Sequence, residues 1–411
     1  MQYLKVNRDF IIFTVSRTLA LLFKPFFIWL LLAKGLNDIS IKVSIYFLIT
    51  SSLMVFFNNE ANVEFYKRKF DTNCSNYLKA KAEYWYYVNS ILHILLFLSV
   101  TFIAIFLIGG LGLSISMILL LLLVLEKIID EIQRDLQFEK KFIEWSKATL
   151  IKFGIPILFV TLLIFLGITH FLFEIYLLVV LLSMVYVILT NLEKRVLKKV
   201  VYLVIRKKGL KLWILYLKNY MNVFVLRQVQ AFLSKNIVLA DRLIVKFINI
   251  ELLPQITIIG QVASVGILFV DYFMISNRRK EYVVKKEILQ IVGVKKIVTT
   301  FLVALFLSSI VMFVVSFNGQ ISLLKVGVIS VFYYSLYAIS QHFVQFNFWN
   351  RSRNILFLID VLFFLLLLGL FTPLFSEVGL LRIVMYLCVI HFVRLILQIV
   401  LSTNSKNENK D

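Results

Sequence analysis

Apolar stretches about as long as a lipid bilayer is thick follow one another along this 411-residue chain, and they constrain its fold more than any other feature. A helix needs about 20 apolar residues to cross the hydrocarbon core, and only helices and closed barrels satisfy every backbone polar group there. We therefore predict an all-α polytopic membrane protein. The twelve expected spans are residues 10–33, 42–57, 86–108, 113–130, 151–170, 173–192, 221–246, 254–276, 297–316, 325–346, 354–372 and 380–401.

Composition excludes a membrane anchor with a soluble head. The chain is 61% hydrophobic and only 16% charged, and its mean hydropathy is +0.90. Soluble domains carry roughly a quarter charged residues, and here no extended polar region separates the apolar stretches. The membrane domain is therefore expected to be the whole protein.

The net charge of +21 follows from membrane topology rather than from a nucleic-acid partner. With the N-terminus in the cytoplasm, 33 of the 44 basic residues fall in the termini and inner loops. The positive-inside rule then places both termini in the cytoplasm. Anionic membrane lipids are the expected partners of these basic segments. Only five basic residues fall on the outer side: Lys34, Lys42, Lys246, Lys325 and Arg382.

The longest basic connector divides the chain into six spans plus six. Residues 1–192 form the predicted N-terminal lobe, 193–220 a cytoplasmic linker lying as an amphipathic helix on the inner surface, 221–401 the C-terminal lobe and 402–411 a polar cytoplasmic tail. The segments SRTLALLFK and LRQVQAFLSK occupy corresponding places early in the two lobes. Such self-similarity indicates a parallel repeat, and we expect two lobes around a central cavity.

Two cations interrupt the first span. Arg17 and Lys24 are seven residues apart, so they project from nearly the same helix face, about 20° from each other. Each cation costs roughly 2.5 to 3.5 kcal/mol at mid-membrane, which favours a functional role. The structural alternative is that either side chain snorkels to the inner surface.

The seventh span is more polar still. From Arg227, helical rotation places Lys235, Arg242 and Lys246 within one sector of about 100°. We expect this face to line an aqueous cavity opposite the first span, with Arg17, Lys24, Arg227, Lys235 and Arg242 binding substrate. The alternative is internal pairing of Asp241 with a neighbouring basic residue.

The other buried ionisable residues are expected to be structural. Asp241 and Asp360 are candidates for pairing, or for coupling to a proton or sodium gradient. His93, His342 and His391 lack metal-ligand spacing, so each is expected to hydrogen-bond to a neighbour. The sequence shows no catalytic constellation, which predicts a transporter without cofactor or metal.

A cation-lined cavity suits an anion. Arginine matches phosphate oxygens with a bidentate fork and lysine adds a point charge. Together they favour a diphosphate over a cationic drug.

At LADRLIVKF, residues 239–247, the chain resembles the Wzx-type O-antigen and polysaccharide flippases of the MATE-like multidrug/oligosaccharidyl-lipid/polysaccharide superfamily. These proteins have Asp-Arg or Asp-Lys before apolar residues in their seventh span. The cationic first span and the arrangement of six plus six spans are also similar to that family. After the seventh span, members of the family often have an acidic residue and then Gly-Tyr. Here Glu251 matches the acidic residue, but the Gly-Tyr is missing.

The resemblance implies a flippase of the bacterial inner membrane. It would move an undecaprenyl-diphosphate-linked oligosaccharide, an O-antigen or capsule repeat unit, between leaflets by alternating access. A proton or sodium gradient is the implied energy source, and other polysaccharide-assembly proteins are implied partners.

Three rival functions remain open. An O-antigen polymerase has a similar number of spans but carries a large extracytoplasmic loop, whereas the outer connections here are short, such as GGLGL from Gly109. A MATE-type small-molecule exporter would be expected to show buried carboxylates in the substrate lobe, which the first span lacks. A lipid II flippase usually brings spans beyond twelve.

Overall fold

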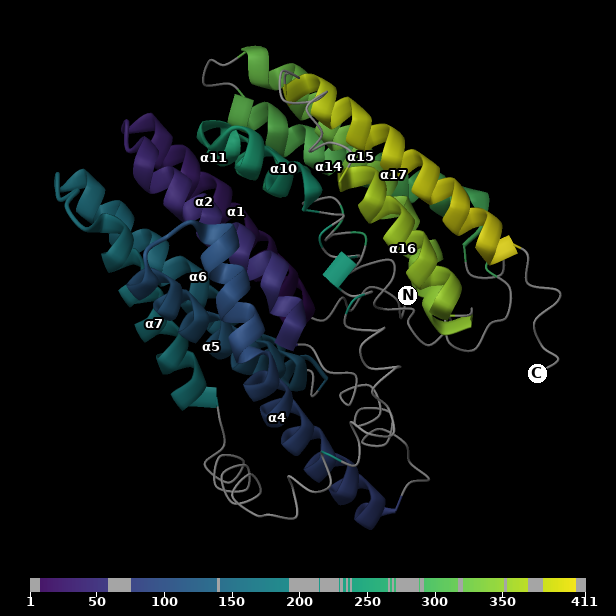
Figure 1. The fold of residues 1–411 in the computed structure, drawn as a ribbon, viewed down its shortest axis with the longest axis horizontal. Coiled ribbons are helices and arrows are strands. Elements are labelled where there is room, and N and C mark those ends of the chain that lie inside the picture. The colour runs from purple at the N-terminus through teal and green to yellow at the C-terminus, as the bar shows by residue number, and fades with distance from the viewer. Residues whose placement is uncertain are drawn as a thin grey trace. The chain divides into compact units, whose positions relative to one another are not determined.

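The regular elements in the described part of the chain are all helices (Figure 1). The computed structural model describes residues 8–57, 75–138, 141–191, 239–264, 292–316, 321–350, 353–368 and 380–403, with a few isolated positions, and none of these lies in a strand. The elements are α1 (Arg8–Ala33), α2 (Asn37–Leu53), η2 (Met54–Phe57), α4 (Asn76–Gly109), α5 (Leu113–Phe138), α6 (Phe142–Phe165), α7 (Leu172–Asn191), α10 (Ala240–Ile248), η3 (Ile250–Leu252), α11 (Leu253–Ala263), α14 (Val294–Ser316), α15 (Ile321–Asn350), α16 (Arg353–Leu368) and α17 (Leu380–Thr403).

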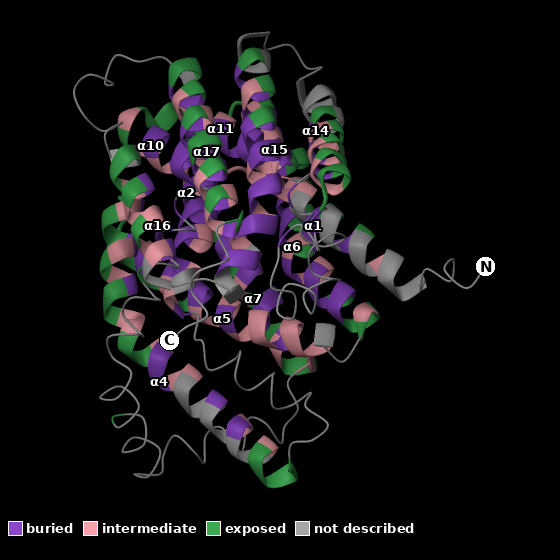
Figure 2. Ribbon diagram, turned by 90° about the vertical axis from the view of Figure 1, so that its right-hand side faces the viewer, coloured by how far each residue is buried: buried purple, intermediate pink, exposed green. Residues whose placement is uncertain are grey.

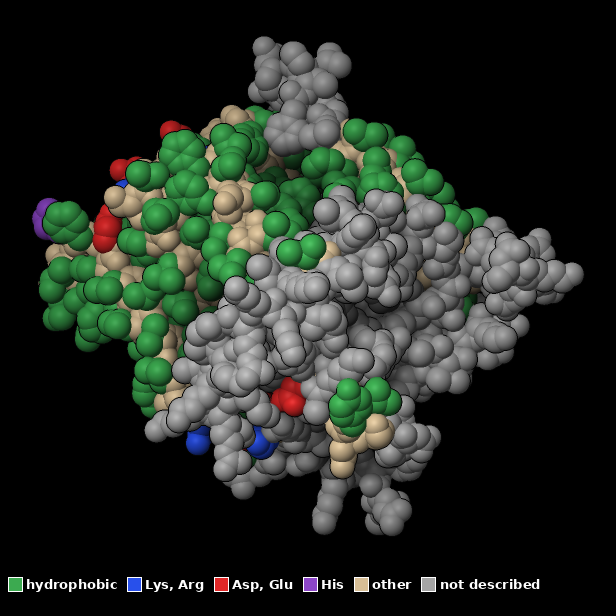
Figure 3. Space-filling view, turned by 60° about the horizontal axis from the view of Figure 1, so that its bottom comes forward, with side chains coloured by type: hydrophobic (Ala, Val, Ile, Leu, Met, Phe, Trp, Pro, Cys, Tyr) green, Lys and Arg blue, Asp and Glu red, His purple; other side chains and the backbone are tan. Residues whose placement is uncertain are grey.

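The protein is an all-α membrane protein. Within the described residues, four segments are long and apolar enough to cross a bilayer: Ser90–Gly109, Phe142–Phe165, Leu172–Asn191 and Leu381–Thr403. Hydrophobic side chains cover most of the described surface in Figure 3, and few charged side chains are visible on it. Such a surface suits lipid and not water. The count of twelve spans stays a prediction.

Each predicted span contains described helical residues, but the helix ends differ from the predicted ones: α6 ends at Phe165, before the predicted residue 170, and several helices run past the predicted ends. The start of α4 at Asn76 precedes the predicted residue 86, and α5 continues to Phe138 beyond residue 130. Likewise α6 starts at Phe142 and not at residue 151. The polar extensions remain helical because charged side chains pair one turn apart, as Arg134 does with Asp130 at 2.8 Å.

The glycine cluster between the third and fourth predicted spans is a tight turn, as its sequence predicts. Gly110 has a φ of +62°, the left-handed conformation that favours glycine, and it ends α4. Its backbone N–H donates to the carbonyl of Phe106 at 3.2 Å, and α5 begins at Leu113. Three residues are therefore enough to join the two helices.

The chain forms two compact units, which we describe separately. The first unit comprises Met1–Ala20 and Ile45–Phe232, and the second comprises Leu21–Ser44 and Leu233–Asp411. In the first unit α5 packs against α4, α6 and α7. The predicted linker 193–220, apart from Ile214, and residues 404–411 of the predicted tail lie outside the described residues, so the predicted lobe boundaries stay predictions.

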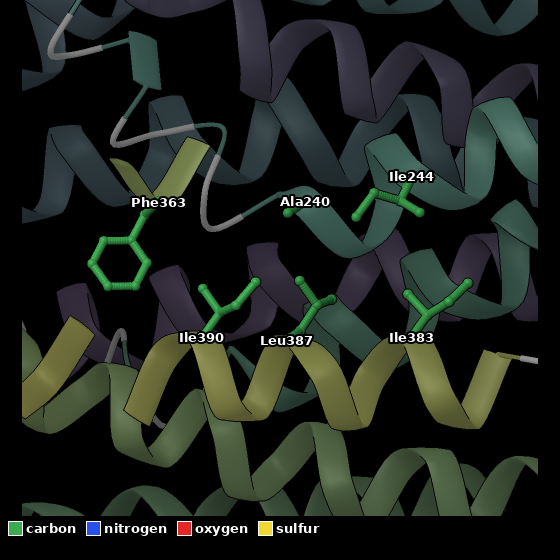
Figure 4. Packing of buried hydrophobic residues seen from close by; sticks show 6 residues of the cluster. All are labelled: Ala240, Ile244, Phe363, Ile383, Leu387 and Ile390. Carbon is green, nitrogen blue, oxygen red and sulfur yellow. The ribbon is translucent and has the colours of Figure 1, made fainter. Parts of the chain in front are cut away.

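In the second unit α15 is the central helix. It packs against α11, α14, α16 and α17, and buried positions run along much of its length (Figure 2). One apolar face of α10 completes this core. Ala240 and Ile244 point toward Ile383, Leu387 and Ile390 of α17 (Figure 4). Because α10 is held on this side by apolar contacts, its polar residues turn into the rest of the unit.

Candidate functional site

The structure locates only part of the predicted cationic cavity. Arg17 and Lys24 both lie on α1, where the side chain of Lys24 is partly buried and that of Arg17 is outside the described part of the structure. Arg227 and Lys235 also lie outside the described residues. A role for these four residues in substrate binding therefore stays a prediction.

Asp241 starts a buried polar network in the first turn of α10. One carboxylate oxygen, Oδ1, accepts the backbone N–H of Arg242 at 2.8 Å. The other, Oδ2, accepts the hydroxyls of Tyr333 at 3.0 Å and Tyr334 at 3.2 Å. The carboxylate also lies at the positive end of the helix dipole. Four favourable influences thus compensate a buried charge, and they tie α10 to α15.

The guanidinium of Arg242 is equally enclosed. Its Nη2 donates to the Tyr334 hydroxyl at 3.3 Å, and its Nε lies 3.9 Å from Oδ1 of Asp241. The group passes directly over Gly260 of α11, where an added Cβ would lie 2.8 Å from Nε and closer still to Nη2. A glycine is therefore needed for this close approach. The buried Nε has no hydrogen-bond acceptor among the described residues.

Aromatic groups extend this network toward α17. The ring of His391 stacks on Tyr333, with centroids 5.2 Å apart and planes at 16°, and Tyr337 meets His391 edge-on at 5.7 Å. Three residues further along α17, Arg394 donates through Nη2 to Asp360 Oδ1 at 2.8 Å. The side chains of both members of this α16–α17 pair are buried.

These contacts bear on the predicted roles of the second unit's charges. Pairing, the alternative to ion coupling, is what the structure shows for both Asp241 and Asp360. Arg242 lies inside the second unit among its own partners, so contact with a substrate would require those partners to move. Its predicted substrate role, and ion coupling by the two acids, stay predictions.

Two of the predicted histidine contacts are confirmed. His93 Nε2 lies 2.8 Å from the carbonyl oxygen of Phe56, and His342 Nε2 lies 3.0 Å from Thr300 Oγ1. Both rings are buried and contact a neighbour at hydrogen-bonding distance. No cluster of metal-ligating side chains occurs in the described residues.

A second buried network, in the first unit, was missed by the sequence analysis. The 33 cations assigned to the termini and inner loops include Lys127 and Lys152, which fall at the ends of the predicted spans 113–130 and 151–170. Their assignment to loops is wrong, because they lie on α5 and α6 and are buried. Lys152 is hydrogen-bonded to Glu126, and Lys127 to Glu131. The spacing of Lys127 and Glu131, one helical turn apart, could have indicated this pair.

Further polar groups enclose this network. Tyr86 of α4 donates its hydroxyl to Glu131, and Arg134 approaches the same carboxylate at 3.3 Å. Nearby, the Gln133 side-chain amide donates to Thr149 Oγ1 at 2.8 Å, which again joins α5 to α6. The network therefore connects three helices of the first unit.

Comparison with known proteins identifies no relative of this chain. No protein-family model matches the chain, and neither a curated protein nor a solved structure is detectably similar to it. The functional argument therefore depends on the chain's own residues and on the local resemblance described above.

Proposed function

We propose that this protein is a flippase that moves undecaprenyl-diphosphate-linked oligosaccharide across the bacterial inner membrane by alternating access. The observation that carries this proposal is the buried Asp241–Arg242 network at the start of α10. Charged residues inside membrane helices are costly and usually mark function. This pair lies within LADRLIVKF, the stretch where the resemblance to polysaccharide flippases is sharpest.

The network suggests that the predicted cations have two different roles, one structural and one in substrate binding. Because Arg242 already has partners within its unit, we assign it to holding α10 against α11 and α15. Lys24, which is only partly buried on α1, is the better candidate for attracting the diphosphate. Arg17, Arg227 and Lys235 are proposed to serve with it, with both termini in the cytoplasm.

Short connections favour a flippase over a polymerase. Three connections lie at the helix ends that we assign to the outer side. They are residues 34–36 between α1 and α2, 110–112 between α4 and α5, and 166–171 between α6 and α7. A polymerase of this general kind would need a large extracytoplasmic loop for glycosyl transfer. These three connections offer no space for one.

The test is deletion of the gene in its host, followed by gel analysis of surface polysaccharide. We expect long chains to disappear and to return with the wild-type gene. The Lys24→Ala variant should restore at most about a tenth of the wild-type amount at equal membrane levels, since it loses a charge contact worth about 1.5 to 3 kcal/mol. Lys34→Ala, which removes an exposed lysine just beyond α1, is the matched control and should restore the chains fully.

Other outcomes would contradict the proposal. Lipid A core carrying a single repeat unit would indicate a polymerase. Full activity of Lys24→Ala would remove that residue from the mechanism, and an unchanged polysaccharide profile after deletion would reject the flippase.

A further inference from the structure

The connection between α6 and α7 contains a backbone conformation that its residue type disfavours. Phe171 has a φ of +52° and is the one non-glycine residue with a positive φ in the described part of the chain. That region suits glycine, and a bulky residue in it is an outlier. Such a conformation persists only where other interactions compensate it, so the surroundings of Phe171 have to be examined.

Hydrogen bonds fix this connection at both of its ends. Gly167, with a φ of +76°, donates its N–H to the carbonyl of Ile164 at 3.1 Å, and Ile168 donates to the carbonyl of Leu163 at 2.9 Å. Together these two bonds form a Schellman motif that closes α6. At the other end, the carbonyl of Phe171 accepts the N–H of Ile175 in α7 at 2.9 Å. The turn therefore holds the Phe171 side chain in a defined place.

The protein itself gives the ring of Phe171 little compensation. Its side chain is 77% exposed, the largest fraction among the large hydrophobic residues that the structure describes. Phe165, Leu166 and Ile168, in and beside the same connection, are also exposed. Apolar surface gains free energy when it leaves water, and here the chain does not supply the cover. The compensating contact must come from outside the chain.

The two flanking helices identify that contact as lipid. Both α6 and α7 are long and apolar enough to cross a bilayer, and exposed apolar side chains recur along each of them at the spacing of one helix face. On α6 they include Leu158, Leu162 and Phe165, and on α7 Leu178, Leu182 and Leu189. Such faces of spanning helices suit acyl chains. The connection continues these apolar faces, so lipid is the surrounding that it meets.

Helix length gives the depth of Phe171 in the bilayer. With its 20 residues, α7 is about 30 Å long at 1.5 Å per residue, which matches the hydrocarbon core of about 30 Å. Its first residue, Leu172, therefore lies at one edge of that core, with Phe171 directly beside it in the chain. His170 and Glu174 are exposed polar residues at the same level, and they suit headgroups and not hydrocarbon.

From this geometry we propose that the α6–α7 connection is a lipid anchor. The ring of Phe171 inserts at the boundary between headgroups and acyl chains, while His170 and Glu174 stay among the headgroups. Burial of the ring in lipid offsets the disfavoured backbone conformation. The anchor fixes the depth at which the α6–α7 hairpin sits in the bilayer, and it does not depend on the proposed flippase function.

Spin labelling of the full-length protein in lipid vesicles tests this position. A nitroxide is attached to Phe171→Cys in protein that also carries Cys74→Ser and Cys388→Ser, in vesicles of phosphatidylethanolamine and phosphatidylglycerol. Collisions with oxygen, which concentrates in hydrocarbon, are compared with collisions with a nickel chelate, which stays in water. We expect a higher ratio of oxygen to nickel collisions at position 171 than at the neighbouring control, His170→Cys.

Two further positions calibrate the measurement. Leu182→Cys, at an exposed site in the middle of α7, should give a higher ratio than position 171. Lys141→Cys, at an exposed site just before α6, should give a low ratio typical of water. A ratio at position 171 equal to that at 141 would overturn the anchor, and one equal to that at 182 would overturn the boundary position. Few collisions with either reagent would mean that protein, such as a second copy of this chain, covers Phe171, and would overturn the choice of lipid.

A second variant covers the case in which the labelled protein does not fold. Phe171→Trp keeps an aromatic ring and both native cysteines. Phosphatidylcholine brominated near the headgroup end of its acyl chains should quench the fluorescence added by this tryptophan more than phosphatidylcholine brominated near the chain ends. Stronger quenching by the deep bromines, or no quenching by either lipid, would overturn the proposal. Neither result depends on whether the protein transports a lipid-linked oligosaccharide.

Discussion

The two buried networks differ in how completely their charged side chains are enclosed. In the second unit the side chains of Asp241, Arg242, Asp360 and Arg394 are all less than 10% exposed, and Tyr333 and Tyr334 add hydrogen bonds to the first of these pairs. In the first unit the lysines are as deeply buried, but Glu126 and Glu131 are about one-fifth exposed. The ion pairs of the second unit are therefore the more completely enclosed.

The same comparison separates two kinds of helix contact. In the second unit α10 is fixed on one side by apolar residues of α17 and on the other by the close approach of Arg242 to Gly260. In the first unit, side-chain polar contacts such as Lys152–Glu126 and Gln133–Thr149 join α5 to α6.

The largest expected effect distinguishes the two ion pairs. Asp360→Asn should destabilise the protein by about 3 to 5 kcal/mol, because it leaves the buried Arg394 charge without its carboxylate. Glu126→Gln should cost less than half as much, because the Glu126 side chain is only partly buried. Thermal unfolding in detergent, monitored by circular dichroism, measures both. Equal losses of stability in the two variants would show that the different exposures of Asp360 and Glu126 do not affect the free energy of unfolding.

A smaller effect is expected at the close contact on α11. Gly260→Ala introduces a Cβ into the guanidinium of Arg242, and such overpacking costs typically 1 to 3 kcal/mol. The control is Gly112→Ala in the turn before α5, where an added Cβ meets no atom within 4 Å. Thermal unfolding should be altered only by the first substitution, and an unaffected Gly260→Ala protein would mean that Arg242 moves aside easily.

The smallest effect concerns a single hydroxyl. Tyr333→Phe removes one of the two tyrosine donors to Asp241, and a hydrogen bond to a charged group is worth about 1.5 to 3 kcal/mol. Because Tyr334 still donates to Asp241, the loss of stability should lie at the lower end of this range. Tyr386→Phe, which removes a longer contact of 3.4 Å to the Leu366 carbonyl, should change stability by less than about 0.5 kcal/mol. A larger loss at Tyr386 than at Tyr333 would contradict the role given to Asp241.

The positions of the helices could be predicted from sequence because lipid imposes a simple rule. A segment that crosses the bilayer must satisfy its backbone internally and present apolar side chains over about 20 residues, and α7 and α17 obey this rule almost to the residue. Gly110 marked a turn for an equally local reason, since its backbone conformation favours glycine.

The ends of α5 and α6 could not be predicted in this way. Hydropathy ends one span at residue 130 and begins the next at residue 151, which leaves Arg134 in a loop and Lys127 and Lys152 at the span ends, because it treats every charge as solvated. In the structure these charges are paired within or between helices, and a paired charge no longer needs water to be stable.

The sequence by itself determined that this is a helical membrane protein, roughly where its spans lie, and that some of them carry charge. Only the tertiary structure decided which charges meet: Glu126 with Lys152, 26 residues apart, and Asp241 with Tyr333, 92 residues apart. The reason is physical. Spans depend on hydropathy accumulated along one segment, whereas an ion pair depends on the contact between two segments, which no local pattern encodes.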